Sequence, residues 1–292
     1  MISDSAIPRI TMPDDLRSAL SAADVPSTTA LGDKASQELA VARLRSQVAR
    51  FDEFMSLAAE MTSSSGGVII ENCAVGSDAV IAVLSACLGY VDPLGNGIPP
   101  RLVFDVTPRR DEHGGVSMAG SSRGAGYFGL HSDSASFAVP HSRVVLACVR
   151  SRAGAGGQSI LVSADAIASA LRAVSPSSLA VLADPVFPFI GSGFSQPSDV
   201  VSAPVLEHDG ARWQVRYTRQ CIVDGLRYRS LDDQHRQALS DFESVLADPA
   251  LAAEFTLLPG DLWILENRRW LHGRRAIDAG SDRLLKRCKV YT

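Results

Sequence analysis

The feature that most constrains this chain is a series of short β-type segments in its C-terminal two thirds. These segments are β-branched or alternate apolar with polar residues, and Gly, Pro and Asp punctuate them. Many short strands with few helices between them are typical of a sandwich or a barrel. Strands are predicted at residues 101–107, 143–149, 158–162, 212–218, 253–258, 261–265 and 286–291.

Helical periodicity dominates the N-terminal part of the chain. Residues 35–61 carry apolar side chains at helical spacing, and residues 77–88 form a second amphipathic stretch. A buried strand is predicted between them, at residues 67–72. Residues 1–34 are rich in Ser, Asp, Pro and Ala without a steady period, so we expect an ordered arm or a loose tail there. Further helices are predicted at residues 163–174 and 231–246.

These patterns predict a mainly β fold with flanking helices. The chain of 292 residues contains no internal repeat and no linker clear enough to divide it. We therefore expect a single domain over residues 35–292, in which the early helices cover the strand-rich part.

Composition and charge exclude several classes of protein. The formal net charge is −4 and aromatic residues make up 6% of the chain, which argues against a basic or base-stacking nucleic-acid surface. No apolar run approaches the length of a bilayer span, and residues 1–8 lack the basic stretch and apolar run that would indicate a secretory signal. The five cysteines are scattered, so we interpret them as reduced thiols of a cytoplasmic protein rather than as a zinc site or a disulfide framework.

One histidine stands apart from the other five because a carboxylate follows two positions later. This is the pair His131 and Asp133. On a strand, residues i and i+2 point to the same face, so an imidazole and a carboxylate there can meet one cation. Taken alone the pair is weak evidence, because the chain has six histidines and 32 acidic residues.

A longer pattern lies near the C-terminus. Residues 259–274 predict a turn, a strand and then His272 just past that strand, within the sequence Asn-Arg-Arg-Trp-Leu-His-Gly-Arg. Asp282 and Arg283 follow, with Arg287 four positions further on. A Gly-Gly-Gln-Ser segment that ends at Ser159 lies between this pattern and the His131 pair.

Together these pieces resemble the iron(II)/2-oxoglutarate-dependent dioxygenases of the taurine dioxygenase and clavaminate synthase-like superfamily. The resemblance spans roughly residues 100–292. It implies a cupin-like double-stranded β-helix, or jelly roll, with the metal inside one open end. It also implies Fe(II), the co-substrate 2-oxoglutarate and O2.

The resemblance assigns His131, Asp133 and His272 as the metal ligands. Two imidazoles and one carboxylate on one face of a metal leave three coordination positions open. Halogenases of this superfamily lack the carboxylate, so the presence of Asp133 indicates oxygenation. The competing interpretation is that these three are ordinary core or surface residues without a metal.

Other roles follow from the same resemblance. Arg283 is expected to bind the far carboxylate of 2-oxoglutarate, since a fork of donors suits a carboxylate. Ser159 is its expected hydroxyl partner, although the superfamily more often has Thr there. Arg287 is expected to bind an anionic group of the main substrate. Arg123 and Tyr127 are substrate candidates in a glycine-rich loop (residues 114–129) that is either a lid or a surface loop.

We expect the remaining basic residues and histidines to be structural or exposed, without a role in the site. A nucleic-acid patch could be read at residues 268–289, which hold eight basic side chains, but few aromatic residues lie between them and the net charge of the chain is negative. We therefore expect a solvated face there. The residues so interpreted are Arg269, Arg274 and Arg275, and the histidines taken as structural or exposed are His113, His141, His208 and His235.

The sequence thus predicts an enzyme that hydroxylates an unactivated C–H bond of an amino acid or an amino-acid-derived natural-product intermediate. The alternatives are the same oxidising chemistry ending in desaturation, cyclisation or epimerisation, and a jelly-roll protein that binds a metal or ligand without redox chemistry. The expected partner is a small molecule that carries a carboxylate, with neither nucleic acid nor membrane involved. Nothing in the sequence specifies an oligomeric state.

Overall fold

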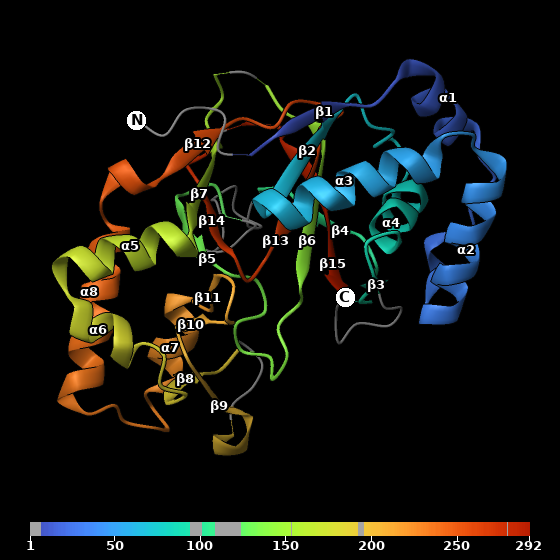
Figure 1. Ribbon diagram of the computed structural model, residues 1–292. Coiled ribbons are helices and arrows are strands. Elements are labelled where there is room, and N and C mark those ends of the chain that lie inside the picture. Colours follow the sequence, from blue (N-terminus) through green and yellow to red (C-terminus); the bar gives the residue numbers. More distant parts are fainter. Residues whose placement is uncertain (1–6, 94–100, 109–123, 153, 192–195, 279) are drawn as a thin grey trace.

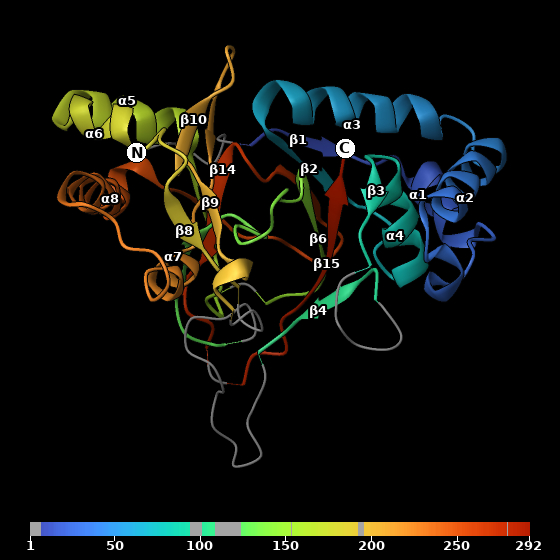
Figure 2. The same ribbon diagram turned by 90° about the horizontal axis from the view of Figure 1, so that it is seen from below.

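The chain folds into two β-sheets that pack face to face between two groups of helices (Figure 1). The computed structural model describes residues 7–93, 101–108, 124–152, 154–191, 196–278 and 280–292. Helices from the first third of the chain cover one sheet, and helices from the last half cover the other (Figure 2). This sheet-rich body with flanking helices confirms the general fold class predicted from the sequence.

The larger sheet has seven strands, and most neighbouring strands within it are antiparallel. Strand β1 pairs with β2 in parallel, and every other pairing in this sheet is antiparallel. Strand β4 (Phe104–Val106) pairs with β15 beside the main path. That path runs β1 (Arg9–Thr11), β2 (Gly67–Glu71), β13 (Leu262–Glu266), β6 (Arg143–Arg150), β15 (Leu284–Tyr291) and β3 (Tyr90–Val91).

The smaller sheet has four antiparallel strands. Strand β14 lies inside it, between β7 and β5, and therefore sits in the middle of the second layer. The order of the strands is β12 (Ala253–Phe255), β7 (Ser159–Ser163), β14 (Trp270–Arg274) and β5 (Phe128–His131).

Strand β13 shows how alternation in the sequence assigns residues to layers. Leu262 and Ile264 pack into the cluster beneath the N-terminal helices, whereas Trp263 and Leu265 pack into the cluster between the two sheets. Successive side chains on a strand point to opposite faces, so an uninterrupted apolar run fills both layers. Every strand predicted from the sequence overlaps an observed strand, although the bounds differ and several observed strands are shorter.

The N-terminal helical pattern was expected over residues 35–61, but it forms two helices. Helix α2 (Lys34–Gln47) ends where Val48 becomes extended, and α3 (Phe51–Ser65) begins after Arg50, whose φ is 63°. The break redirects the chain while each helix still buries its own apolar face, which is why the spacing alone did not reveal it. Helix α4 (Asp78–Ala86) agrees with its predicted position.

Residues before the first predicted helix also contribute ordered elements. Strand β1 extends the larger sheet, and helix α1 (Asp14–Ala22) buries Leu16 and Leu20. A 3-10 turn (Thr28–Leu31) leads into α2. These residues pack into the same apolar cluster as the helices that follow.

The second helical group covers the outer face of the smaller sheet. Helices α5 (Ala164–Val174) and α8 (Asp233–Leu246) agree with their predicted positions within two residues. Two short hairpins complete this side. The remaining elements here are α6 (Pro176–Val181), α7 (Arg219–Gly225), β8 (Phe187–Phe189), β9 (Val201–Ala203), β10 (Leu206–His208) and β11 (Trp213–Val215), with 3-10 turns at Pro197–Asp199 and Pro249–Leu251.

Two further findings concern membranes and thiols. Among the described residues, the helices lack the combination of length and apolarity that crossing a bilayer requires. All five cysteines are free, and Cys73, Cys148 and Cys288 are buried. The absence of disulfides agrees with the interpretation of the cysteines as reduced thiols.

The position of Ile264 in the core makes a prediction about stability. The side chain is fully buried against the N-terminal helices, so Ile264→Ala should leave a cavity and lower the free energy of unfolding by about 2–5 kcal/mol. Urea denaturation followed by circular dichroism measures this loss. The control is Leu39→Ala, at a side chain that is 70% exposed, where a change within about 0.5 kcal/mol is expected. Equal effects at both positions would contradict the assignment of Ile264 to the core.

Candidate active site

The two histidines of the sequence pattern face each other across neighbouring strands. His131 is the last residue of β5 and His272 is the middle residue of β14, and the antiparallel register places them directly opposite each other. Their ring centroids are 4.3 Å apart. With Asp133 they form a buried group in which one ligand atom from each residue lies within 4.8 Å of the others. The structure therefore brings together all three predicted ligands.

The elements that carry two of these ligands differ from the predicted ones. His272 was expected just past a strand, but it lies within β14, a strand that the sequence pattern did not separate from β13. Asp133 was expected on the same strand as His131, but β5 ends at His131 and Asp133 belongs to the turn that follows. Its carboxylate is placed by tertiary contacts and not by strand alternation.

The imidazole rings are arranged as neutral nitrogen donors. His131 Nδ1 is 2.9 Å from the carbonyl oxygen of Gly129, which suits a proton on Nδ1 and leaves Nε2, 4.0 Å from Asp133 Oδ1, as an acceptor. Burial lowers the pKa of His131, although Asp133 acts in the opposite direction. Burial, together with His131, lowers the pKa of His272 to about 3. His272 Nδ1 is buried and has no hydrogen-bond partner among the described residues.

The carboxylate of Asp133 is held in its charged form. Burial by itself would raise its pKa, but Arg287, Lys289 and the two histidines hold the pKa well below its usual range. Arg287 Nη1 lies 3.4 Å from both carboxylate oxygens, and Lys289 Nζ lies 3.4 Å from Oδ1. The site thus combines two neutral imidazoles with one ionised carboxylate, which is a donor set suited to a divalent transition metal.

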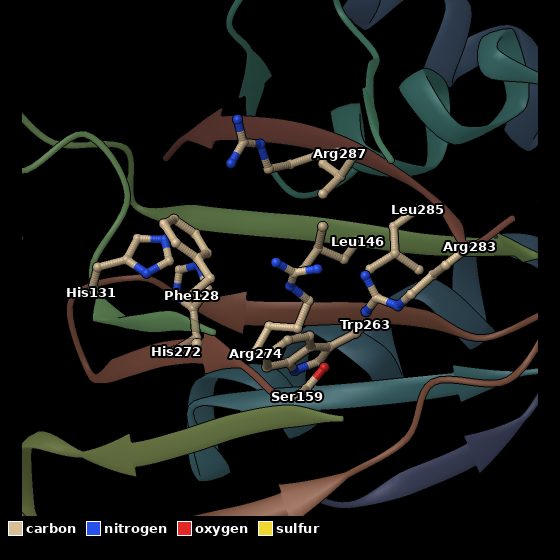
Figure 3. A pocket seen from close by; sticks show the side chains of 12 residues that line it. Phe128, His131, Leu146, Ser159, Trp263, His272, Arg274, Arg283, Leu285 and Arg287 are labelled. Carbon is tan, nitrogen blue, oxygen red and sulfur yellow. The ribbon is translucent and has the colours of Figure 1, made fainter. Parts of the chain in front are cut away.

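A cavity extends from the histidines between the two sheets (Figure 3). His131, His272 and Phe128 line one end of it, and Arg283 lies at the other end. Leu146 and Trp263, from the larger sheet, form part of its wall (Figure 3). Also lining it are Ser159, Arg274, Leu285, Arg287, Val106 and Gly273.

The Gly-Gly-Gln-Ser segment and Arg283 meet at the far end of this cavity. Arg283 is 5% exposed and Ser159, the first residue of β7, is 4% exposed. Gly157 has a φ of +77°, and a Cβ there would lie 3.2 Å from Cδ of Arg283. Glycine at this position therefore permits both the left-handed backbone and the close packing of the arginine stem.

Comparison with known proteins identifies the family. A family model described as "Taurine catabolism dioxygenase TauD, TfdA family" matches residues 27–289. The chain belongs to this dioxygenase family. The resemblance inferred from the sequence is confirmed. No match was found among curated protein sequences.

Solved structures with the same fold include two oxygenases. An asparagine oxygenase in complex with Fe(II), 2S,3S-3-hydroxyasparagine and succinate has a TM-score of 0.71 at 20% identity, over 97% of this chain and 93% of its own. The non-heme iron oxygenase OrfP in complex with Fe and alpha-ketoglutaric acid has a TM-score of 0.73 at 18% identity, over 97% of this chain and 94% of its own. At such identities the likeness shows a shared fold.

One prediction about the basic residues of this TauD/TfdA family member is wrong. Arg274 was expected on a solvated face with Arg269 and Arg275, but it is 6% exposed and lines the cavity. Its Nη2 donates to the carbonyl oxygens of Gly124 and Gly126, at 2.7 and 2.9 Å. Burial and the charge of Arg283 lower the pKa of Arg274 to about 10. Because Arg274 lies two positions after His272 on β14, it points to the same side of the sheet.

Of the two predicted substrate residues of the glycine-rich loop, the structure describes Tyr127, which does not line this cavity. Tyr127 is 52% exposed and lines a separate groove with Tyr217 and Glu243. Arg123 lies outside the described residues. Arg275 is exposed, as expected, and its guanidinium pairs with Glu254.

Sequence reasoning assigned no role to Asn267, although it begins the Asn-Arg-Arg pattern. This side chain is fully buried and joins the turn after β13 to the turn that carries Asp133. Its Oδ1 accepts from the Asp133 N–H at 2.8 Å, and its Nδ2 donates to the carbonyl oxygens of Asp133 and His141 at 2.9 and 2.8 Å. A buried amide that completes three backbone contacts is a positioning residue for the Asp133 turn.

Replacing Asn267 should therefore lower the stability of the protein and weaken metal binding at the candidate site. Asn267→Ala leaves three buried backbone groups without partners, so the free energy of unfolding should fall by at least about 2 kcal/mol. Affinity for a divalent metal should fall as well, because Asp133 loses its support. Chemical denaturation and metal titration measure the two effects. Gln220→Ala, at an exposed amide, is the control, and an unchanged stability of Asn267→Ala would refute this role.

Proposed function

We propose that this chain is an Fe(II)- and 2-oxoglutarate-dependent oxygenase that hydroxylates an amino acid or an amino-acid-derived compound at an unactivated C–H bond. The observation that carries the proposal is a single cavity that joins the buried group of His131, Asp133 and His272 to Ser159 and Arg283. Membership of a dioxygenase family supports the same conclusion.

His131, Asp133 and His272 would hold the iron. Their donor atoms lie close enough together for one ion, they are buried, and one ring nitrogen of His272 has no partner among the described residues. When bound, ferrous iron supplies the activation of O2 that inserts oxygen into a C–H bond. Three protein ligands leave room for the co-substrate and O2. The neutral imidazoles and the ionised carboxylate need not lose or gain a proton before they bind it.

Arg283 and Ser159 would bind the far carboxylate of 2-oxoglutarate. The guanidinium offers a fork of donors, and its burial makes a charge-assisted pair stronger than it would be in water. The hydroxyl of Ser159 adds one further donor at the same end. The apolar wall formed by Leu146, Trp263 and Leu285 excludes water from the space between this end and the histidines.

Arg287 would bind a carboxylate of the main substrate. It reaches from β15 to the Asp133 side of the metal centre, away from Arg283 (Figure 3). The related asparagine oxygenase and OrfP were crystallised with hydroxylated amino acids, which supports an amino-acid substrate here. The chain's role in the reaction is then to orient the substrate C–H bond near the metal centre.

The fold that we infer for this activity is a jelly roll. Its support is the face-to-face packing of a seven-stranded and a four-stranded sheet, with the three ligands on β5, its following turn and β14. We also propose that residues 35–292 form one catalytic domain. The ordered elements that precede residue 35 pack against this domain. Five free thiols support a reducing compartment such as the cytoplasm.

Removing either histidine tests the metal assignment. His131→Ala and His272→Ala should each abolish iron-dependent formation of succinate, because two ligands cannot hold the ion in this geometry. Anaerobic titration with Fe(II) and 2-oxoglutarate, followed by the visible absorption of the complex, measures binding separately from turnover. Circular dichroism verifies that the fold remains. Turnover that survives in either variant would remove the assignment, and an absence of succinate in the wild-type protein would favour a binding protein without redox chemistry.

Replacing Arg283 tests the co-substrate site. Arg283→Gln should weaken 2-oxoglutarate binding by about 1.5–3 kcal/mol, the value of a hydrogen bond to a charged group. The matched control is Arg275→Gln, at an exposed arginine of the same segment that pairs with Glu254. Isothermal titration of the Fe(II)-loaded protein measures both affinities. Equal affinity for 2-oxoglutarate in the Arg283 variant and the wild type would exclude this role.

The reaction itself is tested by a screen of amino acids and related compounds. Succinate release that depends on the added compound, together with a mass gain of one oxygen atom, is expected for the true substrate. A mass loss of two hydrogen atoms would instead indicate desaturation or ring closure by the same site.

A further inference from the structure

A second cation, Lys289, lies beside Arg287 at the metal centre. It follows Arg287 by two positions on β15, so both side chains point to the inner face of the larger sheet. Lys289 is 9% exposed, and its Nζ lies 3.4 Å from Asp133 Oδ1. The same oxygen is 3.4 Å from Arg287 Nη1. Two cationic groups therefore meet at one carboxylate oxygen.

Lys289 is held in place by a chain of buried polar contacts. Its Nζ donates to Ser134 Oγ at 3.1 Å, and Ser134 Oγ is 2.7 Å from His141 Nδ1. His141 is fully buried, its Nε2 lies 2.9 Å from Asp92 Oδ2, and its ring stacks on Tyr291 at 4.3 Å between centroids. The ammonium group is thus fixed before any ligand arrives, which reduces the entropy lost on binding.

The charges around the cavity do not balance. Arg274, Arg283 and Arg287 line the cavity, and Lys289 lies beside it, in contact with Asp133, the carboxylate that Arg287 also contacts. Among the described residues that line the cavity, none is acidic. Fe(II) and 2-oxoglutarate carry equal and opposite charges, so their binding leaves the positive excess unchanged. A buried positive excess is unfavourable unless a further anion enters.

Metal binding would increase the excess of positive charge around Asp133. A carboxylate that coordinates a divalent cation has less negative charge left for its other neighbours. Once Asp133 serves as a ligand, Arg287 and Lys289 lose much of their counter-charge at the same time. One substrate carboxylate can pair with one of them, and a second anionic group is needed for the other.

We propose that the main substrate is an acidic amino acid of the aspartate or glutamate type, with one carboxylate on Arg287 and the other on Lys289. This inference rests on the proposed function and narrows its substrate class. The two cations contact the same oxygen of Asp133, so their charged groups lie close together. Two carboxylates of one short molecule can therefore reach both of them. A cationic amino acid is repelled here, and an amide leaves Lys289 without a counter-charge, so both are discriminated against.

Anaerobic isothermal titration of the protein loaded with Fe(II) and saturating 2-oxoglutarate tests this inference by binding alone. The titrants are L-aspartate, L-glutamate, L-asparagine and L-arginine. One of the two acidic amino acids should bind tightest, and the Lys289→Met variant should bind it about tenfold or more weakly. In that variant the preference for the acid over its amide should also shrink, whereas Lys289→Arg, which keeps the charge, should retain the preference.

The matched control is Lys286→Met, on the same strand. The Lys286 ammonium faces away from the cavity and pairs with Asp78 and Asp105, so its loss should leave all four affinities unchanged. Thermal denaturation establishes that each variant is folded. Should Lys289→Met unfold, the order of the four affinities in the wild-type protein still decides whether an acidic amino acid is preferred.

Three results would overturn the inference: tighter binding of L-asparagine or L-arginine, no binding of either acidic amino acid, or an equal loss for every titrant in Lys289→Met. The last would make Lys289 a support for Asp133 only. The first titration of each series, 2-oxoglutarate into the Fe(II)-loaded protein, separates these results from a failure of the proposed function. If 2-oxoglutarate binds, only the substrate class is wrong; if it does not, the oxygenase proposal itself fails.

Discussion

The register between β5 and β14 is the constraint on which the rest of the site depends. It places His131 opposite His272, although the two are 141 positions apart along the chain. A shift of one residue would turn one imidazole to the opposite face of the sheet, because side chains alternate along a strand. The register is secured on the other side of β14 by a full antiparallel ladder with β7, which runs from Trp270 to Arg274. The smaller sheet therefore serves as the frame that positions the two histidines of the proposed metal site.

The site buries several cationic side chains, and burying unpaired charge lowers the stability of the folded state. Arg283 and Lys289 are almost completely buried, and among the described residues the guanidinium of Arg274 donates only to backbone carbonyl oxygens. Keeping cations out of water costs free energy unless opposite charge or hydrogen bonds compensate. Ligands that bind only the folded state offset this cost and raise its stability. The same charges that cost folding free energy would give the cavity its affinity and selectivity for anions.

The strand-rich part of the fold was predictable because local patterns coincide there with tertiary packing. Strand β13 and helices α5 and α8 lie where alternation and periodicity placed them. The boundary between α2 and α3 was not predictable, since the apolar spacing continues across it and only the left-handed Arg50 marks the turn. Short strands such as β8 and β9 carry too few residues for a period to be recognised.

For the site, the sequence by itself determined the types of residue available: two imidazoles, a carboxylate and arginines in a pattern that one oxygenase family shares. Tertiary structure alone decided how these side chains are arranged. Asp133 stands beyond its strand because Asn267, far along the chain, holds the turn. Arg274 faces inward and Lys289 reaches Asp133 because β14 and β15 present those faces to the cavity. Residue type is a local property, whereas burial, register and the balance of charge arise only when distant segments pack together.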